Sequence, residues 1–225
     1  MDFELAAQPR FFTLQEAPLW TRYDVEVDKA EPVNRGDAPT CPQCGDVVGM
    51  LTWQPPYRIH LILHGEEFGD FLETVGHDLL VSERFAQAFH AEGLTGLEGF
   101  HPAEVLKVRR RRRGPKPTTV PTYLVVRARY GPAAVDLARS GVRYDEPPTC
   151  GWCRDTNKKA IYGYSLEAGT WQGEDVFRPR GLPGCVTVSE RFERFVAKHG
   201  FTNMQLTPTE EYVWDPLAPK LEPST

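Results

Sequence analysis

Residues 81–85 read VSERF, and residues 188–192 read VSERF again. An upstream block repeats in the same order, because PTCPQCGD at residues 39–46 parallels PTCGWCRD at residues 148–155. Two collinear blocks with nearly equal spacing predict a tandem duplication. Downstream, the match continues with three further pairs: Gly93 and Gly200, Thr95 and Thr202, and Glu104 and Glu211.

Each VSERF segment begins a predicted helix. Ser82 suits the N-cap, because its hydroxyl can accept a hydrogen bond from a free backbone N–H of the first turn. Phe85, Ala88 and Phe89 follow at the spacing of one helix face. Gly93 suits the left-handed residue that ends a helix. Since the second copy repeats this pattern, we expect short helices over residues 83–92 and 190–199.

Several strands are predicted around these helices. Apolar and polar residues alternate over residues 24–28, 58–63 and 124–129. Alternation with a period of two is typical of strands in a sheet with one solvent-exposed face. The expected order in each copy is therefore a strand, a CxxC turn, further strands, a short helix and a final strand.

Four of the five cysteines form two CxxC pairs. Cys41 and Cys44 lie in CPQCG, and Cys150 and Cys153 lie in CGWCR. A CxxC turn places two thiolates on one side of a tight loop, and two such turns complete a tetrahedral four-thiolate zinc site. The pairs are distant in sequence, but a duplication lets each copy supply half of the ligands. The pattern predicts one structural zinc ion bound by all four cysteines.

The repeats and the cysteines together predict an α+β fold. We expect a tandem duplication of a mostly antiparallel sheet, with one short helix per copy and the zinc site at the pseudo-twofold axis that joins the copies. The expected organisation is a first copy over residues 1–108, a basic linker over residues 109–119, and a second copy over residues 120–225.

Other interpretations of the cysteines stay open. Each pair could form its own disulfide, which a reducing cytosol disfavours. Each pair could bind a separate metal with histidines, although His60, His64 and His77 have no clear counterparts in the second copy. Redox chemistry needs a helix N-terminus beside the thiol, whereas a strand is expected after Lys158. Cys185 stands alone and is expected to be a small buried apolar residue.

The run Arg109–Arg113, followed by Gly-Pro-Lys-Pro, predicts an exposed linker or hairpin tip. Five consecutive like charges resist burial, and the prolines exclude regular structure. Arginine also neutralises phosphates, so a zinc-ribbon-like module that binds nucleic acid or acts in transcription is an alternative function. The net charge of −5 for the whole chain disfavours that alternative.

The composition and the missing motifs narrow the class of protein. With 225 residues, 40% hydrophobic and 25% charged, the chain is an ordinary folded protein of one or two domains. It has neither an apolar run of roughly 20 residues nor a secretory signal, so we expect no membrane partner and a cytoplasmic location. It contains no HExxH, GxSxG, Walker or GxGxxG motif, which indicates a binding protein instead of an enzyme.

The CPQCG motif, the second CxxC and the segment DLLVSERF at residues 78–85 carry a resemblance to a known family. The chain resembles the double-CXXCG-motif immunity proteins of myxobacteria, and the likeness covers essentially its whole length. That family is associated with the swarming-inhibition toxin system. The resemblance implies a cytoplasmic immunity protein that binds and neutralises a cognate protein toxin. Arg154 departs from the family pattern, which implies glycine at that position.

A partner surface is expected on the acidic half of the chain. Residues 1–105 carry 6 Lys+Arg against 18 Asp+Glu, while residues 106–225 carry 20 against 13. Toxins that act on nucleic acids are often basic, and complementary charge speeds association. Trp53, Trp152 and Trp171 are candidate contact residues if they are exposed, and ordinary core residues if they are buried. The toxin, its contact residues and the oligomeric state are not encoded in any readable motif.

Overall fold

The structure is a computed structural model that describes residues 9–111 and 119–218. Within these ranges the protein is sheet-rich and contains two α-helices, which confirms an α+β fold. The helices are α1 (Glu83–Ala91) and α2 (Glu190–His199), and a 3-10 turn η1 spans Thr209–Glu211. The strands are β1 (Phe11–Glu16), β2 (Val25–Lys29), β3 (Asn34–Arg35), β4 (Trp53–Gln54), β5 (Arg58–Leu63), β6 (Phe71–Glu73), β7 (Leu79–Ser82), β8 (Leu97–Pro102), β9 (Glu104–Arg110), β10 (Tyr123–Ala134), β11 (Val142–Tyr144), β12 (Lys158–Tyr162), β13 (Val176–Arg180), β14 (Val186–Ser189), β15 (Met204–Pro208) and β16 (Val213–Trp214).

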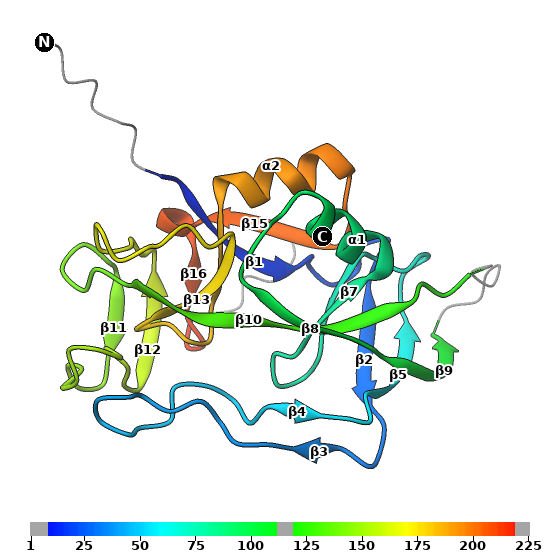
Figure 1. Cartoon of the computed structure of the whole chain (residues 1–225), viewed down its shortest axis with the longest axis horizontal. Coiled ribbons are helices and arrows are strands. Elements are labelled where there is room, and N and C mark those ends of the chain that lie inside the picture. Colours follow the sequence, from blue (N-terminus) through cyan, green and yellow to red (C-terminus); the bar gives the residue numbers. More distant parts are fainter. Residues whose placement is uncertain (1–8, 112–118, 219–225) are drawn as a thin grey trace, which may run out of the picture.

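The central sheet has the order β15-β1-β14-β13-β10-β7-β6, and β8 pairs with β10. Three smaller sheets surround it: β11-β12-β16, β2-β5-β9 and the short pair β3-β4. In Figure 1 both helices lie on the same side of the central sheet, and β10 runs between the two outer three-stranded sheets. Pairing is mostly antiparallel, with β10–β13 and β5–β9 as parallel pairs.

The two helices begin and end as the sequence predicts. Ser82 Oγ accepts a hydrogen bond from the backbone N–H of Phe85 at 3.3 Å, and Ser189 Oγ caps α2 in the same way. Gly93 and Gly200 follow the helices with φ of 63° and 59°. These are left-handed conformations, which glycine adopts at little cost. The caps therefore fix the length of both helices.

Both helices bury their apolar faces in one shared core. Phe85 of α1 contacts Phe192 and Phe195 of α2, with ring centroids 6.1 and 5.5 Å apart. Phe89 and Phe201 complete this aromatic cluster, and all five rings are buried. Fully burying a side chain of this size stabilises a fold by about 1.5–3 kcal/mol relative to exposure. The helices thus hold the two predicted copies together through a common core.

Two strands cross between the predicted copies. β1, from the first copy, pairs with β14 and β15 of the second, with Phe11 opposite Ser189. The start of β10, from the second copy, pairs with β7 and β8 of the first, with Tyr123 opposite Ser82. The serine opposite each crossing strand is the N-cap of a helix. The central sheet is therefore built from both halves of the sequence.

Arg109 and Arg110 lie at the end of β9, in the stretch predicted to be a linker. They pair with Ile62 and Leu63 of β5 and so continue the strand. The side chain of Arg109 stays exposed, so its charge is not buried even though its backbone lies in a strand. Residues 112–118 of the predicted linker lie outside the described residues, and the proposed copy boundaries remain a prediction. No helix in the described ranges has the length and apolarity to span a membrane.

Candidate metal centre

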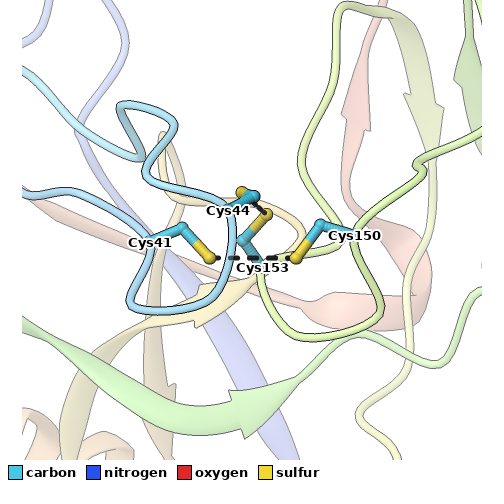
Figure 2. A group of neighbouring side chains, drawn as sticks. All are labelled: Cys41, Cys44, Cys150 and Cys153. Atoms are coloured by element: carbon cyan, nitrogen blue, oxygen red, sulfur yellow. Dashed lines mark hydrogen bonds between the residues drawn. The ribbon is translucent and has the colours of Figure 1, made fainter.

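The two CxxC turns meet in space. The Sγ atoms of Cys41, Cys44, Cys150 and Cys153 all lie within 4.8 Å of one another. The first turn lies on the chain between β3 and β4, and the second lies between β11 and β12. Figure 2 shows the two loops facing each other with their sulfurs pointing into the space between them. The sequence prediction that these four residues gather at one point is therefore confirmed.

The spacing of the sulfurs fits a tetrahedral metal site. Cys41 Sγ lies 3.8 Å from Cys150 Sγ, and Cys44 Sγ lies 3.8 Å from Cys153 Sγ. A zinc–sulfur distance of about 2.3 Å gives Sγ–Sγ separations of about 3.8 Å in a regular tetrahedron. All four cysteines are free, so neither CxxC pair forms a disulfide.

Each CxxC turn has the same backbone geometry. The N–H of Gly45 donates to the carbonyl of Cys41 at 2.9 Å, and the N–H of Arg154 donates to the carbonyl of Cys150 at 3.0 Å. Both donor residues are left-handed, with φ of 80° for Gly45 and 53° for Arg154. The residue after the second cysteine therefore turns the chain in the same way in both loops.

Arg154 occupies this left-handed position at a cost that glycine avoids, of about 1 kcal/mol. Its side chain makes compensating contacts. The guanidinium donates to the carbonyl of Val135 at 2.8 Å and to that of Gly151 at 3.2 Å. It also forms an ion pair with Glu167. These contacts connect the second CxxC turn to the residue after β10 and to the loop after β12, so the side chain of Arg154 adds an anchor for the turn.

Backbone amides favour thiolates at the first cysteine of each turn. Burial tends to raise the pKa of Cys41, but the N–H groups of Cys44 and Gln43 outweigh it and lower that pKa to about 6. The N–H groups of Cys153 and Trp152 likewise lower the pKa of Cys150. Hydrogen bonds to a charged form stabilise that form. Both turns are thus prepared to present a sulfur anion.

The second cysteine of each turn behaves in the opposite way. The pKa of Cys44 is raised despite the backbone N–H of Asp46, because local desolvation of the sulfur and the neighbouring thiols of Cys41 and Cys150 disfavour a second anion. Burial, reinforced by Cys150, also raises the pKa of Cys153. Four sulfur anions this close repel one another in the absence of a cation. A divalent metal ion removes that repulsion and allows all four cysteines to bind as thiolates.

The site is held from one side by an aromatic and cationic support. The carbonyl of Trp152 accepts a hydrogen bond from Arg180 at 2.9 Å, and the Arg180 guanidinium lies 5.1 Å from the indole ring. Tyr130 of β10 packs against the same indole with ring centroids 5.9 Å apart. Cys41 and Cys153 are buried, while Cys44 is exposed. The cysteine cluster therefore lies near the surface, and the contacts of Trp152 with Arg180 and Tyr130 support the second CxxC turn.

The other interpretations of the cysteines find less support. No histidine among the described residues joins a group of metal-binding side chains with the cysteines. The second turn leads to strand β12 and lacks the helix N-terminus that a redox CxxC needs. Cys185 is buried in a separate apolar cluster, as expected, and burial raises its pKa to about 11.

The tryptophans named as candidate contacts are mostly covered. Trp53 is only 2% exposed and belongs to a core cluster with residues of β2 and β5, so of the two alternatives it is an ordinary core residue. Trp152 packs beside the cysteines, and Trp171 contacts Phe11 with ring centroids 5.1 Å apart. Trp20, which was not among the predicted contact residues, is exposed. Its loop, which follows Pro18, shows no periodicity that could have indicated this.

The fold and the cysteine cluster define the chain as a sheet-rich α+β protein with a four-cysteine centre, compatible with a metal such as zinc. No family model matches the sequence, and no curated protein is significantly similar to it.

Proposed function

We propose that Cys41, Cys44, Cys150 and Cys153 bind one zinc ion, and that its role is structural. Four cysteine ligands fill every position of a tetrahedral zinc, so no position is left for a substrate or a water nucleophile. The support is the meeting of four sulfurs from two distant turns within 4.8 Å. When bound, the ion cross-links the loop after β3 to the loop after β11. These loops have little other regular structure to hold them.

The chain is, in this proposal, an internal pseudo-dimer that arose by duplication, with the zinc near its pseudo-twofold axis. The reciprocal exchange of β1 and the start of β10 supports this, because the two strands pair with equivalent partners. So does the matching left-handed geometry after Cys44 and Cys153. A duplicated chain of this kind offers a rigid, continuous surface without any requirement for a catalytic cleft.

The function that we propose is that of an immunity protein. It binds a cognate protein toxin in the cytoplasm and neutralises it without catalysis. The support is the sequence resemblance carried by CPQCG and DLLVSERF, together with a cysteine centre whose ligands leave no open coordination position. The cytoplasm suits the proposal, because a reducing compartment keeps the four thiols available for metal.

Co-expression tests the proposal directly. The chain is produced together with the candidate toxin encoded beside its gene, and growth of the host is measured. Restored growth and a co-purifying one-to-one complex are expected, and a Cys150→Ser variant should lose both if the zinc holds the binding surface in place. Growth arrest without any complex at micromolar concentrations of both proteins would exclude the immunity function.

A nucleic-acid-binding module is the second candidate, favoured by one observation. Lys107, Arg109 and Arg111 are exposed on and just after β9, which forms the edge of the β2-β5-β9 sheet. Neutralised phosphates make such binding strongly salt-dependent. The triple substitution of these residues by glutamine should abolish retention on heparin if this function is correct. A wild-type chain that passes through heparin at low salt would exclude it.

A further inference from the structure

A groove of about 340 Å³ opens at the end of β1, on the acidic half of the sequence. Most of its lining residues come from the end of β1 and the loop after it, from β2, and from β6 and the turn between β6 and β7. This volume lies at the small end of the range of about 300–1,000 Å³ that is typical of pockets for small ligands, and it suits one or two side chains. The residues that line the groove are Glu16, Ala17, Leu19, Trp20, Asp24, Val25, Glu26, Val27, His64, Glu73 and Val75.

The groove is largely apolar, and its rim is exposed. Leu19 and Val75 both line the groove, with 73% and 88% of their surfaces exposed to solvent. Trp20 lies beside Leu19 and is also exposed. Large apolar side chains gathered around a hollow commonly mark a surface that binds another molecule. Exposed tryptophans are among the residues that contribute most to protein–protein binding.

Four carboxylates border this apolar surface, and among the described residues neither lysine nor arginine lines the groove. Glu16 accepts a hydrogen bond from the side-chain amide of Asn203, and Asp24 accepts one from the backbone N–H of Trp20, both at 2.8 Å. These partners carry no charge. Glu26 contacts His64 at 3.1 Å, and Glu73 contacts His77. In the described residues, no lysine or arginine forms an ion pair with Glu16, Asp24 or Glu26, so much of their negative charge is not compensated.

Glu16 shows how unfavourable this accumulation of charge is. Burial, together with the nearby carboxylates of Glu73 and Asp24, raises the pKa of Glu16 to about 7, although Asn203 works against the shift. A cation that enters the groove would favour the ionised carboxylate. The groove therefore combines an apolar lining with negative charge that a positively charged partner group can neutralise.

We propose that this groove is the docking site for a segment of the toxin that carries an arginine or lysine next to an aliphatic side chain. The proposal rests on the immunity function proposed above. The aliphatic side chain covers Leu19, Trp20 and Val75, and the cationic group lies against the carboxylates. The excess of 18 Asp+Glu over 6 Lys+Arg in residues 1–105 extends the same charge around the site and speeds association with a basic partner.

A peptide titration tests the groove without the toxin. The full chain is labelled with 5-fluorotryptophan, and the fluorine resonance of Trp20 is assigned by its loss in a Trp20→Phe variant. The probe is the peptide Ac-Ala-Leu-Arg-Leu-Ala-NH2, and the control peptide carries Glu in place of Arg. The Arg peptide should shift the Trp20 resonance in a saturable and salt-dependent way, and the Glu peptide should leave it unchanged. No shift with either peptide, or equal shifts with both, would overturn the proposal.

Matched variants separate the local site from the net charge. The double variant Glu16→Gln/Glu26→Gln should lower the affinity for the Arg peptide at least tenfold. Glu146→Gln/Glu210→Gln removes the same charge from exposed positions outside the groove and should change the affinity less than twofold. An equal loss of affinity in the two variants would show that only the net charge of the protein matters, and this would overturn the proposal. Thermal unfolding of both variants shows whether they remain folded.

The toxin complex then distinguishes the two proposals. If the Arg peptide binds at Trp20 but no toxin complex forms, the groove stands as a site for a basic segment and the immunity function fails. If the toxin complex forms and the Glu16→Gln/Glu26→Gln variant keeps its full affinity for the toxin, the immunity function stands and the groove is not its docking site.

Discussion

Asp70 accepts a hydrogen bond at 2.9 Å from the backbone N–H of Thr202, 132 positions further along the chain. Its other carboxylate oxygen accepts a hydrogen bond from Ser82, which caps α1. Arg84 pairs with Asp70 and donates to the carbonyl of Gly200, at the end of α2. One buried aspartate therefore ties the start of the first helix to the loop after the second.

Asp175 makes the reciprocal set of contacts. It accepts hydrogen bonds from Ser189, the cap of α2, and from the backbone N–H of Thr95, after α1. Arg191 pairs with it and donates to the carbonyl of Glu92. Each aspartate thus binds the cap of one helix and the chain that follows the other helix. Both are among the most buried charged residues of the described chain, so the two networks lock the halves together.

Removal of either aspartate should destabilise the whole protein. Asp70→Ala leaves the hydroxyl of Ser82 and the N–H of Thr202 without their acceptor, and we expect a loss of about 3 kcal/mol in the free energy of unfolding. Asp175→Ala should cost a similar amount, because its contacts are equivalent. Urea unfolding followed by circular dichroism measures both. Glu83→Gln, at an exposed position, is the control, and a loss below 0.5 kcal/mol for either aspartate variant would contradict the locking role.

A second prediction concerns the metal. Elemental analysis of the purified chain should give one zinc per molecule. Cys150→Ser should release it and lower the free energy of unfolding by about 4 kcal/mol, because zinc binding in small domains is coupled to folding. Cys185→Ala should keep the zinc, since Cys185 lies in a separate cluster. Two zinc ions per chain, or an unchanged unfolding midpoint after chelation, would rule out a shared structural site.

Arg154 allows a test of the second CxxC turn by comparison of two substitutions. Arg154→Ala keeps a Cβ in the left-handed conformation and loses the contacts to Val135 and Glu167, so we expect a loss of about 2 kcal/mol. Arg154→Gly loses the same contacts but removes the backbone cost, and it should be more stable than the alanine variant by about 1 kcal/mol. Thermal unfolding of the zinc-loaded proteins compares them. An alanine variant at least as stable as the glycine variant would show that the left-handed backbone carries no cost.

Local features of this fold could be predicted from the sequence, while its long-range pairing could not. Ser82 marks the start of α1 and Gly93 follows its end, and both act through contacts within a few residues. Such contacts are encoded locally in the sequence. The cysteine cluster could be predicted from the sequence, because cysteine ligands at CxxC spacing are typical of only a few kinds of site. Phe11 pairs with Ser189, however, and no local pattern indicates that β1 leaves its own half of the sequence.

The sequence also could not predict whether two tryptophans, Trp53 and Trp20, are buried or exposed. Trp53 has charged and polar neighbours in the sheet, yet it is covered by the second core cluster, with the ammonium of Lys29 lying 5.0 Å from its ring. Trp20 lies between Leu19 and Thr21 in the sequence and is exposed. The difference depends on which element packs above each residue, and this is decided by tertiary structure. The groove beside Trp20 likewise brings residues 16–27 together with His64, Glu73 and Val75, which lie further along the chain.

The raised pKa of Glu16 predicts a specific dependence of stability on pH. In the folded protein, burial and the carboxylates of Glu73 and Asp24 raise this pKa to about 7, with the amide of Asn203 opposing the shift, whereas the ordinary value is 4.5. Between these two pH values the folded state binds more protons than the unfolded state, so stability falls as pH rises through that window and is constant above it. The loss attributable to Glu16 is about 2–3 kcal/mol.

Glu16→Gln should remove this loss, because glutamine keeps an acceptor for Asn203 and cannot ionise. The free energy of unfolding, measured by urea titration at pH 5, 6, 7 and 8, should decrease more steeply for the wild type than for the variant, and the variant should be the more stable protein at pH 8. Glu146→Gln, at an exposed position away from the groove, should keep the wild-type slope. If the free energy of unfolding of the wild type and of Glu16→Gln changed with pH in parallel, Glu16 would ionise normally. The groove would then contain no carboxylate with a raised pKa.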